Sequence, residues 1–279
     1  MSGPDHRLTL ARPDLAAQAL EGLVRATRYA PTTPMACLSP AAAIRRDADL
    51  EAEQLDQLLF GESFDVLETA GGWAWGQARR DGYVGFVALD DLRPEPPAAT
   101  HWVSALRAYA FTAPSIKSRI RGLYSMNALV AIEAREGRFA RASGAGWFVE
   151  AQLSPIGQVE PDPATVAERY VGAAYQWGGR ESLGLDCSGL VQQALLACGR
   201  ACPRDTDMQA QIGQPIARED LRRGDLVFWL GHVGMMQDEI RLIHANAYHM
   251  AVAIEPLGAA IERIGRTETG QPTGFRRVG

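Results

Sequence analysis

Short segments of alternating apolar and polar residues, separated by tight turns, fill much of the first half of this chain. Phe64–Glu68, Trp73–Ala78 and Tyr83–Ala88 have this pattern, and the turns between them contain Ala70-Gly71-Gly72 and Arg80-Asp81-Gly82. Alternation with a period of two predicts strands, and short strands joined by tight turns are typical of a small β-barrel. These residues therefore favour antiparallel sheet.

The same pattern recurs after Pro94-Glu95-Pro96-Pro97, a run that breaks regular structure and marks a linker. Ala128–Ala134 and Arg138–Ala142 are predicted strands, and a further strand begins at Trp147. Gly85-Phe86-Val87 and Gly146-Trp147-Phe148 occupy equivalent places in the two segments and form a weak internal repeat. The repeat predicts two related barrels.

The ends of the chain have other patterns. Residues 13–26 place Leu15, Ala19, Leu23 and Val24 on one face of an amphipathic helix. Beyond residue 164, predicted helices precede predicted strands, which indicates an α+β domain. The helices are Ala164–Tyr175 and Cys187–Ala197, and the strands are Leu226–Trp229, Val233–Met236, Leu242–Ala245 and Ala251–Glu255. We therefore expect an α+β chain with a helical segment over 1–26, barrels over 27–95 and 96–157, and an α+β domain over 158–279.

Composition restricts the partners and the compartment. The net charge of -5 argues against nucleic acid, which requires clustered basic residues. No apolar stretch is long enough to span a membrane, and the N-terminus has no basic region followed by an apolar core. We therefore expect a cytoplasmic protein that binds neither nucleic acid nor membrane. The four cysteines form no CxxC pair and have no nearby histidine, so no metal site is expected.

Cys187 is the first candidate for chemistry. Asp186 is a good N-cap, which places Cys187 in the first turn of the predicted helix. The partial positive charge and free amide donors of a helix N-terminus favour a thiolate and can hold an oxyanion. The helix is therefore expected to lower the pKa of Cys187. The alternative is a small buried hydrophobic residue, as most free cysteines are.

Two histidines flank a polar turn, Gln237-Asp238-Glu239. In a hairpin centred on Asp238, His232 and His244 lie six residues to either side and face one another on one face of the sheet. Directly opposed side chains have Cβ atoms about 4.5 to 5.5 Å apart, so one imidazole can orient the other. A base and an orienting partner are what a nucleophile requires. The alternative is two unrelated histidines on a polar strand face.

These residues belong to six blocks whose order closely resembles the papain-like NlpC/P60 cysteine peptidases of peptidoglycan. The blocks are Tyr175–Gly179, Leu185–Gln192, Pro203–Asp205 with Gln209, Arg223–Phe228, His232–Gly234 and Ile243–Ala245. The resemblance implies that Cys187 is the nucleophile, His232 its base and His244 the third member of the triad. It also implies that Tyr175 lies near the oxyanion site.

The N-terminal half more loosely resembles the bacterial SH3-like domains that precede this domain in γ-D-glutamyl-L-diamino acid endopeptidases. In those enzymes the first SH3-like domain covers the active site and supplies a Glu and a Tyr. With the Asp before the Cys, these residues bind the free amine of an N-terminal L-alanine. The matching residues are Glu62, Tyr83 and Asp186, and Ser188 is a further substrate-binding candidate. The alternative for Glu62 and Tyr83 is strand-edge residues without a ligand.

The resemblance implies hydrolysis of the γ-D-Glu–diaminopimelate bond in peptides such as L-Ala-γ-D-Glu-diaminopimelate. The expected process is cell-wall recycling, without a metal or organic cofactor. Three alternatives stay open: remodelling of intact wall, an amidase or acyltransferase acting elsewhere, and an inactive module that binds wall peptides.

Overall fold

The computed structural model describes residues 4–94 and 96–278. It divides into two compact units, Met1–Ile156 and Gly157–Gly279, and each is described here by itself. The division lies one residue before the boundary expected between the second barrel and the α+β domain. The boundary expected at residue 95 and the start of the N-terminal segment, residues 1–3, fall on positions outside the described residues.

The predicted N-terminal helix is wrong. β1 (Leu15–Ala17) pairs in parallel with β2 (Arg28–Ala30), and only a 3-10 turn over Gln18–Leu20 lies between them. Leu15 packs on Trp75 of the first barrel, whereas Leu23, assigned to the same helix face, is exposed. Packing of a short extended segment against an aromatic ring has overridden a weak helical pattern.

The first barrel contains one sheet with the strand order β5-β4-β8-β7-β6-β3-β9. Its core includes Ile44, Leu58, Phe64 and Val87. The three strands predicted from alternation are present as β6, β7 and β8. The strands are β3 (Thr33–Cys37), β4 (Ala41–Arg45), β5 (Gln54–Leu59), β6 (Ser63–Ala70), β7 (Trp73–Ala78), β8 (Val84–Ala88) and β9 (Leu92–Pro94), with η2 (Leu89–Asp91) before β9.

The second barrel has the same strand arrangement, split into two sheets with the orders β12-β11-β16-β15-β14 and β13-β10-β17. In both barrels a strand, a 3-10 turn and a short last strand follow one another: β8, η2 and β9 in the first, β16, η3 and β17 in the second. The predicted repeat is therefore confirmed. The elements are β10 (His101–Val103), β11 (Arg107–Phe111), β12 (Ile120–Ser125), β13 (Leu129–Val130), β14 (Ile132–Glu136), β15 (Phe139–Ala142), β16 (Gly146–Val149), η3 (Glu150–Gln152) and β17 (Leu153–Pro155).

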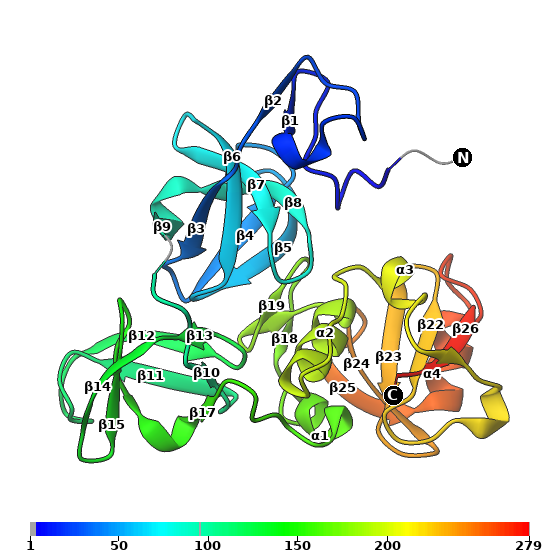
Figure 1. Cartoon of the computed structure of the whole chain (residues 1–279). Coiled ribbons are helices and arrows are strands. Elements are labelled where there is room, and N and C mark those ends of the chain that lie inside the picture. Colours follow the sequence, from blue (N-terminus) through cyan, green and yellow to red (C-terminus); the bar gives the residue numbers. More distant parts are fainter. Residues whose placement is uncertain (1–3, 95, 279) are drawn as a thin grey trace. The chain divides into compact units, whose positions relative to one another are not determined.

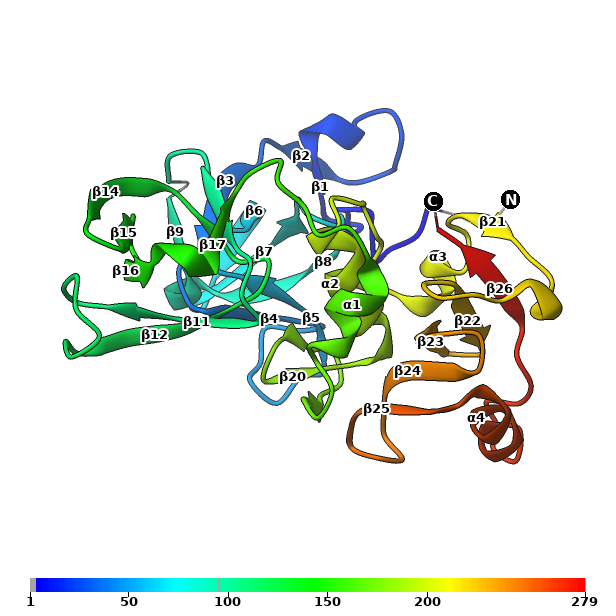
Figure 2. The same cartoon turned by 90° about the horizontal axis from the view of Figure 1, so that it is seen from below.

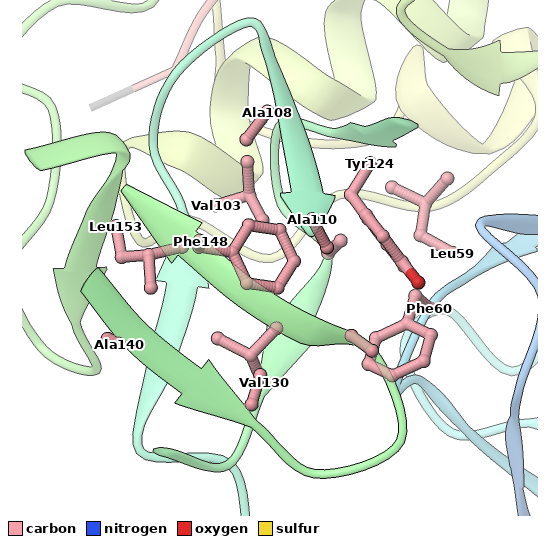
Figure 3. Close-up of a cluster of buried hydrophobic side chains, with 13 residues drawn as sticks. Leu59, Phe60, Val103, Ala108, Ala110, Tyr124, Val130, Ala140, Phe148 and Leu153 are labelled. Carbon is pink, nitrogen blue, oxygen red and sulfur yellow. The ribbon is translucent and has the colours of Figure 1, made fainter. Parts of the chain in front are cut away.

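The two barrels of this unit share a core. Leu59 and Phe60, at the end of β5, lie among the buried side chains of the second barrel (Figure 3). The Phe60 ring meets Tyr124 edge-on, with centroids 5.0 Å apart. Gly61 has φ +77°, and a Cβ there would collide with the carbonyl of Leu129, so only glycine fits at this approach. The junction is therefore a packed interface.

The second unit is built on a nine-stranded sheet with the order β19-β20-β18-β25-β24-β23-β22-β26-β21. Its strands are β18 (Ala174–Tyr175), β19 (Arg180–Glu181), β20 (Gly184–Leu185), β21 (Gln214–Pro215), β22 (Leu226–Trp229), β23 (His232–Met236), β24 (Arg241–Asn246), β25 (Ala251–Pro256) and β26 (Gly274–Arg277). Its helices are α1 (Pro163–Glu168), α2 (Cys187–Ala197), α3 (Thr206–Gln209), η4 (Arg218–Asp220) and α4 (Leu257–Ile264).

Most of this unit follows the prediction. α2 has the predicted bounds, and the four predicted strands occur as β22 to β25. The helix expected over Ala164–Tyr175 ends at Glu168, and the chain then turns into β18. Figures 1 and 2 show β22 to β25 side by side, and in Figure 2 they lie between α2 and α4.

α2 packs on β23 and β24, whereas α4 buries Leu257, Ile261 and Ile264 against strand residues such as Trp229 and Leu242. Within the described residues, no helix is long and apolar enough to cross a membrane.

Candidate active site

Cys187 is the first residue of α2. The Asp186 side chain caps this helix by accepting a hydrogen bond from the Gly189 amide at 2.8 Å. The thiol is buried, with its Sγ 3.9 Å from the Thr206 hydroxyl and within reach of a hydrogen bond from the Val233 backbone. The nucleophile candidate thus lies beside the residue that follows His232 in β23.

The environment of Cys187 favours the neutral thiol. Burial, reinforced by the Asp186 carboxylate, raises the pKa of Cys187 to about 11. The contacts from Val233, Thr206 and the Arg204 charge act in the opposite direction but are weaker. The expected low pKa of Cys187 is therefore wrong, because desolvation, the largest cause of the shift, disfavours the thiolate.

His232 and His244 lie on one face, but the hairpin register differs from the prediction. Met235 pairs with Ile243 and Met236 with Leu242, so the hairpin is centred on Glu239 rather than Asp238. In this register Gly234, not His232, is opposite His244, and the histidines are diagonal neighbours. Diagonal side chains remain within reach of one another when they are long. His232 Nε2 lies 2.8 Å from His244 Nδ1.

Both imidazoles are held neutral. Burial lowers the pKa of His232 to about 3, with help from the charges of His244 and Arg263. Burial also lowers the pKa of His244, although a hydrogen bond to Glu255 opposes the shift. The Trp229 ring lies against the His232 ring, with the centroids 5.6 Å apart. Burial therefore favours the neutral form of both the Cys187 thiol and the His232 imidazole.

Tyr175 ends the short strand β18 and is half-buried. Burial and the charge of Cys187 raise its pKa, so its hydroxyl keeps its proton. A protonated phenol can donate a hydrogen bond, which is the property that an oxyanion partner needs. The oxyanion role of Tyr175 stays a prediction.

Asp186 and Ser188 belong to a buried polar network around Arg204. Asp186 accepts hydrogen bonds from the amides of Gly178 and Gly189, from the Ser188 hydroxyl at 3.1 Å and from both terminal nitrogens of Arg204. Ser188 also accepts from Arg204 at 2.8 Å. These contacts order the start of α2. The substrate-binding roles of Asp186 and Ser188 stay predictions.

Glu62 and Tyr83 are both buried within the first unit. The Glu62 carboxylate accepts a hydrogen bond from the Leu59 amide at 3.1 Å and pairs with the Arg80 guanidinium at 2.7 Å. Arg80 in turn donates to the carbonyl of Asn127 in the second barrel. Glu62 therefore supports the turn that carries Phe60 into the shared core. The predicted roles of Glu62 and Tyr83 in substrate binding remain predictions.

Sequence reasoning missed Glu255. Its Oε1 lies 2.8 Å from His244 Nε2, and the same oxygen is bound by Arg263 of α4. The pairing of Leu242 with Glu255 puts the carboxylate on the His244 face of the sheet. A correct register for β24 and β25 would have found it, but the sequence does not give that register.

His244, His249 and Glu255 have ligand atoms within 4.8 Å of one another, a spacing at which three side chains can share a metal ion. However, the Arg263 cation is bound to the carboxylate that such an ion would need. Like charges compete for one carboxylate, so the donor set favours a hydrogen-bonded chain.

Comparison with protein families identifies two segments of the chain. Residues 172–261 match the NlpC/P60 family, and residues 44–92 match the bacterial dipeptidyl-peptidase Sh3 domain. The first match contains Cys187, His232 and His244. The second covers most of the first barrel.

Relatives extend the likeness beyond these segments. A Bacillus subtilis protein named gamma-D-glutamyl-L-lysine dipeptidyl-peptidase is 26% identical in an alignment of 234 residues, and the match covers 76% of each chain. Dipeptidyl-peptidase 6 of Lysinibacillus sphaericus is 25% identical over 72% of this chain and 83% of its own. A probable endopeptidase of Mycobacterium tuberculosis is 36% identical over 93 residues, but these are only 24% of that protein.

A crystal structure of an NlpC/P60 family protein from Bacillus cereus shares the fold, with a TM-score of 0.74. At 18% identity it covers 88% of this chain and 99% of the other. The expected fold, a papain-like α+β domain preceded by SH3-like barrels, is confirmed. The chain therefore carries an NlpC/P60 peptidase domain, which a bacterial SH3 domain precedes in the sequence.

Proposed function

We propose that this peptidase hydrolyses the γ-D-Glu–diaminopimelate bond of peptidoglycan stem peptides that carry a free N-terminal L-alanine. The observation that carries the proposal is the buried Cys187 at the start of α2, which packs on β23, the strand that begins with His232. His232 in turn is hydrogen-bonded to His244 of the neighbouring strand β24. The name of the Bacillus subtilis relative supports a γ-D-glutamyl substrate.

The reaction is acyl transfer. His232 takes the proton of Cys187 as Sγ attacks the carbonyl carbon of the γ-D-glutamyl amide. The Cys187 amide and the Tyr175 hydroxyl stabilise the oxyanion. The imidazolium then gives its proton to the leaving amine, and water hydrolyses the thioester with His232 again as base. Because burial disfavours both the thiolate and the imidazolium, proton transfer accompanies the attack rather than preceding it.

The biological setting is part of the proposal. A preference for released peptides with a free amine, in the cytoplasm, would place the enzyme in cell-wall recycling. Glu62, Tyr83 and Asp186 are the residues proposed to recognise the amine, and Ser188 is a further proposed substrate-binding residue. In polymerised wall the alanine nitrogen is a neutral amide, which cannot pair with a carboxylate. A lost hydrogen bond to a charged group costs about 1.5 to 3 kcal/mol, or about 10- to 100-fold in specificity.

One experiment tests these steps together. Purified protein is incubated with L-Ala-γ-D-Glu-meso-diaminopimelate, with its N-acetylated form and with intact sacculi, and the products are identified by mass spectrometry. Cys187→Ala serves as the control for contaminating activity. We expect L-Ala-D-Glu and free diaminopimelate from the first substrate only.

The other outcomes separate the alternatives. Equal cleavage of the N-acetylated peptide would refute the recognition of the free amine. Release of fragments from sacculi would indicate wall remodelling. Absence of cleavage of every peptide would leave an amidase or acyltransferase on another substrate, or a binding module.

A further inference from the structure

A carboxylate and a guanidinium extend the histidine pair away from Cys187. His244 Nε2 lies 2.8 Å from Glu255 Oε1, and Arg263 Nη2 contacts the same oxygen. We propose that Glu255 is a positioning residue: it fixes the tautomers of both histidines and so leaves a lone pair on His232 Nδ1 for the thiol proton of Cys187. This inference rests on the proposed roles of Cys187, His232 and His244.

The sheet register aligns these side chains. Gly234 on β23 is opposite His244 in the register of the hairpin, and His232 precedes it by two residues. On the other side of β24, Ala253 pairs with His244 and Glu255 follows it by two residues. His232, His244 and Glu255 thus form a diagonal row across three adjacent strands. The residues directly opposite His244, Gly234 and Ala253, are small. They leave room for the His244 ring to reach its diagonal neighbours on both sides.

The contact between the histidines does not by itself choose a direction. A neutral imidazole carries one N–H donor and one acceptor nitrogen. The distance of 2.8 Å between His232 Nε2 and His244 Nδ1 fits either nitrogen as the donor. If His244 donates, His232 must carry its proton on Nδ1, and that nitrogen is then no base. A third group must break this symmetry.

Glu255 supplies the asymmetry because an ionised carboxylate only accepts hydrogen bonds. His244 must then carry its proton on Nε2, which leaves Nδ1 as an acceptor. His232 must donate to that acceptor from Nε2, which leaves the lone pair on Nδ1. Glu255 therefore determines which nitrogen of each imidazole carries the proton, and so leaves His232 Nδ1 free to accept the proton of Cys187.

Glu255 is held in its ionised form. Although burial alone would raise its pKa, hydrogen bonds and charges of His244 and Arg263 keep that pKa below its ordinary value. Arg263 comes from the last turn of α4, and its guanidinium also lies 4.4 Å from the centre of the Tyr248 ring. Arg263 thus anchors the carboxylate between β25 and α4.

Among the residues that the structure describes, four charged or titratable groups face His244. They are His232 from β23, Glu255 from β25, Arg263 from α4 and His249, whose ring centroid lies 6.5 Å from that of His244. Of these, the carboxylate is the acceptor in contact with Nε2. Loss of Glu255 would leave Arg263, a donor, as the nearest charged group on that side, and a donor favours the reversed tautomers.

The direct test is the tautomer itself. Long-range proton–nitrogen correlation spectra of the full chain with 15N-labelled histidine, assigned with His232→Ala and His244→Ala, locate the proton of each ring. At neutral pH we expect both rings to be protonated on Nε2. A proton on Nδ1 of His244 in the wild-type protein would overturn the proposal, whether or not the tripeptide is a substrate.

Three variants connect the tautomer to the reaction. Glu255→Leu removes the acceptor, Glu255→Gln keeps a carbonyl acceptor without the charge, and Glu262→Gln is the matched control. Glu262 is an exposed residue of α4, the helix that carries Arg263, and it pairs with Arg266 just beyond the end of that helix. We expect kcat for Glu255→Leu to fall about 10- to 100-fold with KM unchanged, by analogy with the loss on removing a carboxylate that orients a metal-bound histidine.

The kcat of Glu255→Gln should lie between the kcat values of Glu255→Leu and of the control, Glu262→Gln. The histidines of Glu255→Gln should keep the wild-type tautomers. In Glu255→Leu the His244 proton should shift toward Nδ1. Unchanged kcat and unchanged tautomers in Glu255→Leu would refute the positioning role. If Glu255→Leu does not fold, the spectra of the wild type and Glu255→Gln still decide the proposal, because both contain the acceptor.

Discussion

Alkylation of Cys187 should depend on pH as for a thiol with a pKa near 11. Cys187 is desolvated at the start of α2, and burial is the largest cause of the shift to about 11 from an ordinary value of 9.0. A pKa of about 11 instead of 9.0 lowers the thiolate fraction of Cys187 at pH 7 about 100-fold, to roughly one molecule in 10,000. Since iodoacetamide reacts with the thiolate, the rate should rise about tenfold per pH unit between pH 7 and pH 10.

The assay measures the rate at single cysteines. Native protein is treated with iodoacetamide at pH 6 to 10, quenched and digested, and the Cys187 peptide is quantified by mass spectrometry. Burial of the thiol lowers the alkylation rate by the same factor at every pH, so the increase of the rate with pH is unchanged. His232→Ala should show the same slope, because a neutral His232 holds no thiolate in the resting enzyme.

One result would refute this reasoning. The alkylation rate of Cys187 could reach a plateau below pH 7 in the wild type and show no such plateau in His232→Ala. That result would identify a resting thiolate–imidazolium pair of Cys187 and His232. In that case the charge pairing of Cys187 with His232 would outweigh the desolvation of both groups.

Three further predictions concern activity and stability. His232→Ala should be close to inactive in peptide hydrolysis, whereas His244→Ala should retain more activity because it orients rather than transfers a proton. Arg204→Met should lower the free energy of unfolding by about 3 to 5 kcal/mol in urea denaturation, because it leaves the buried Asp186 unpaired; an unchanged midpoint would refute the importance of this pair. Phe60→Ala should cost about 3 to 5 kcal/mol in the first unit by emptying the shared core, as measured by the same method.

The sequence predicted the elements whose signals are local. The capping Asp186 and the apolar face of α2 gave the helix its bounds, and Gly146 with Trp147 identified the repeated strand of the second barrel. The N-terminal helix failed because Leu15 gains more by packing on Trp75 than by completing a helical face. Such tertiary packing leaves no mark on the periodicity of one short segment.

The hairpin was predicted to centre on Asp238 but centres on Glu239, because the Asp238 side chain forms the start of the turn. Asp238 accepts hydrogen bonds from the amides of Ile240 and Arg241, at 2.9 and 2.7 Å, and so occupies the first position of the turn rather than its tip. The Gln237 amide donates to the Arg241 carbonyl, which closes the turn around Glu239. Aspartate favours such turns, but its position within one is set by the whole loop.

Burial of the site had no sequence signal, and it changes what the reaction requires. If Cys187 and His232 formed a resting ion pair, the imidazolium would carry protons on both nitrogens and its tautomer would not matter. Desolvation instead favours the neutral form of both groups, so the proposed reaction needs a lone pair on His232 Nδ1. That nitrogen is defined only because Glu255 cannot donate to His244. The same burial that disfavours the thiolate therefore makes a carboxylate two strands away from His232 matter for proton transfer.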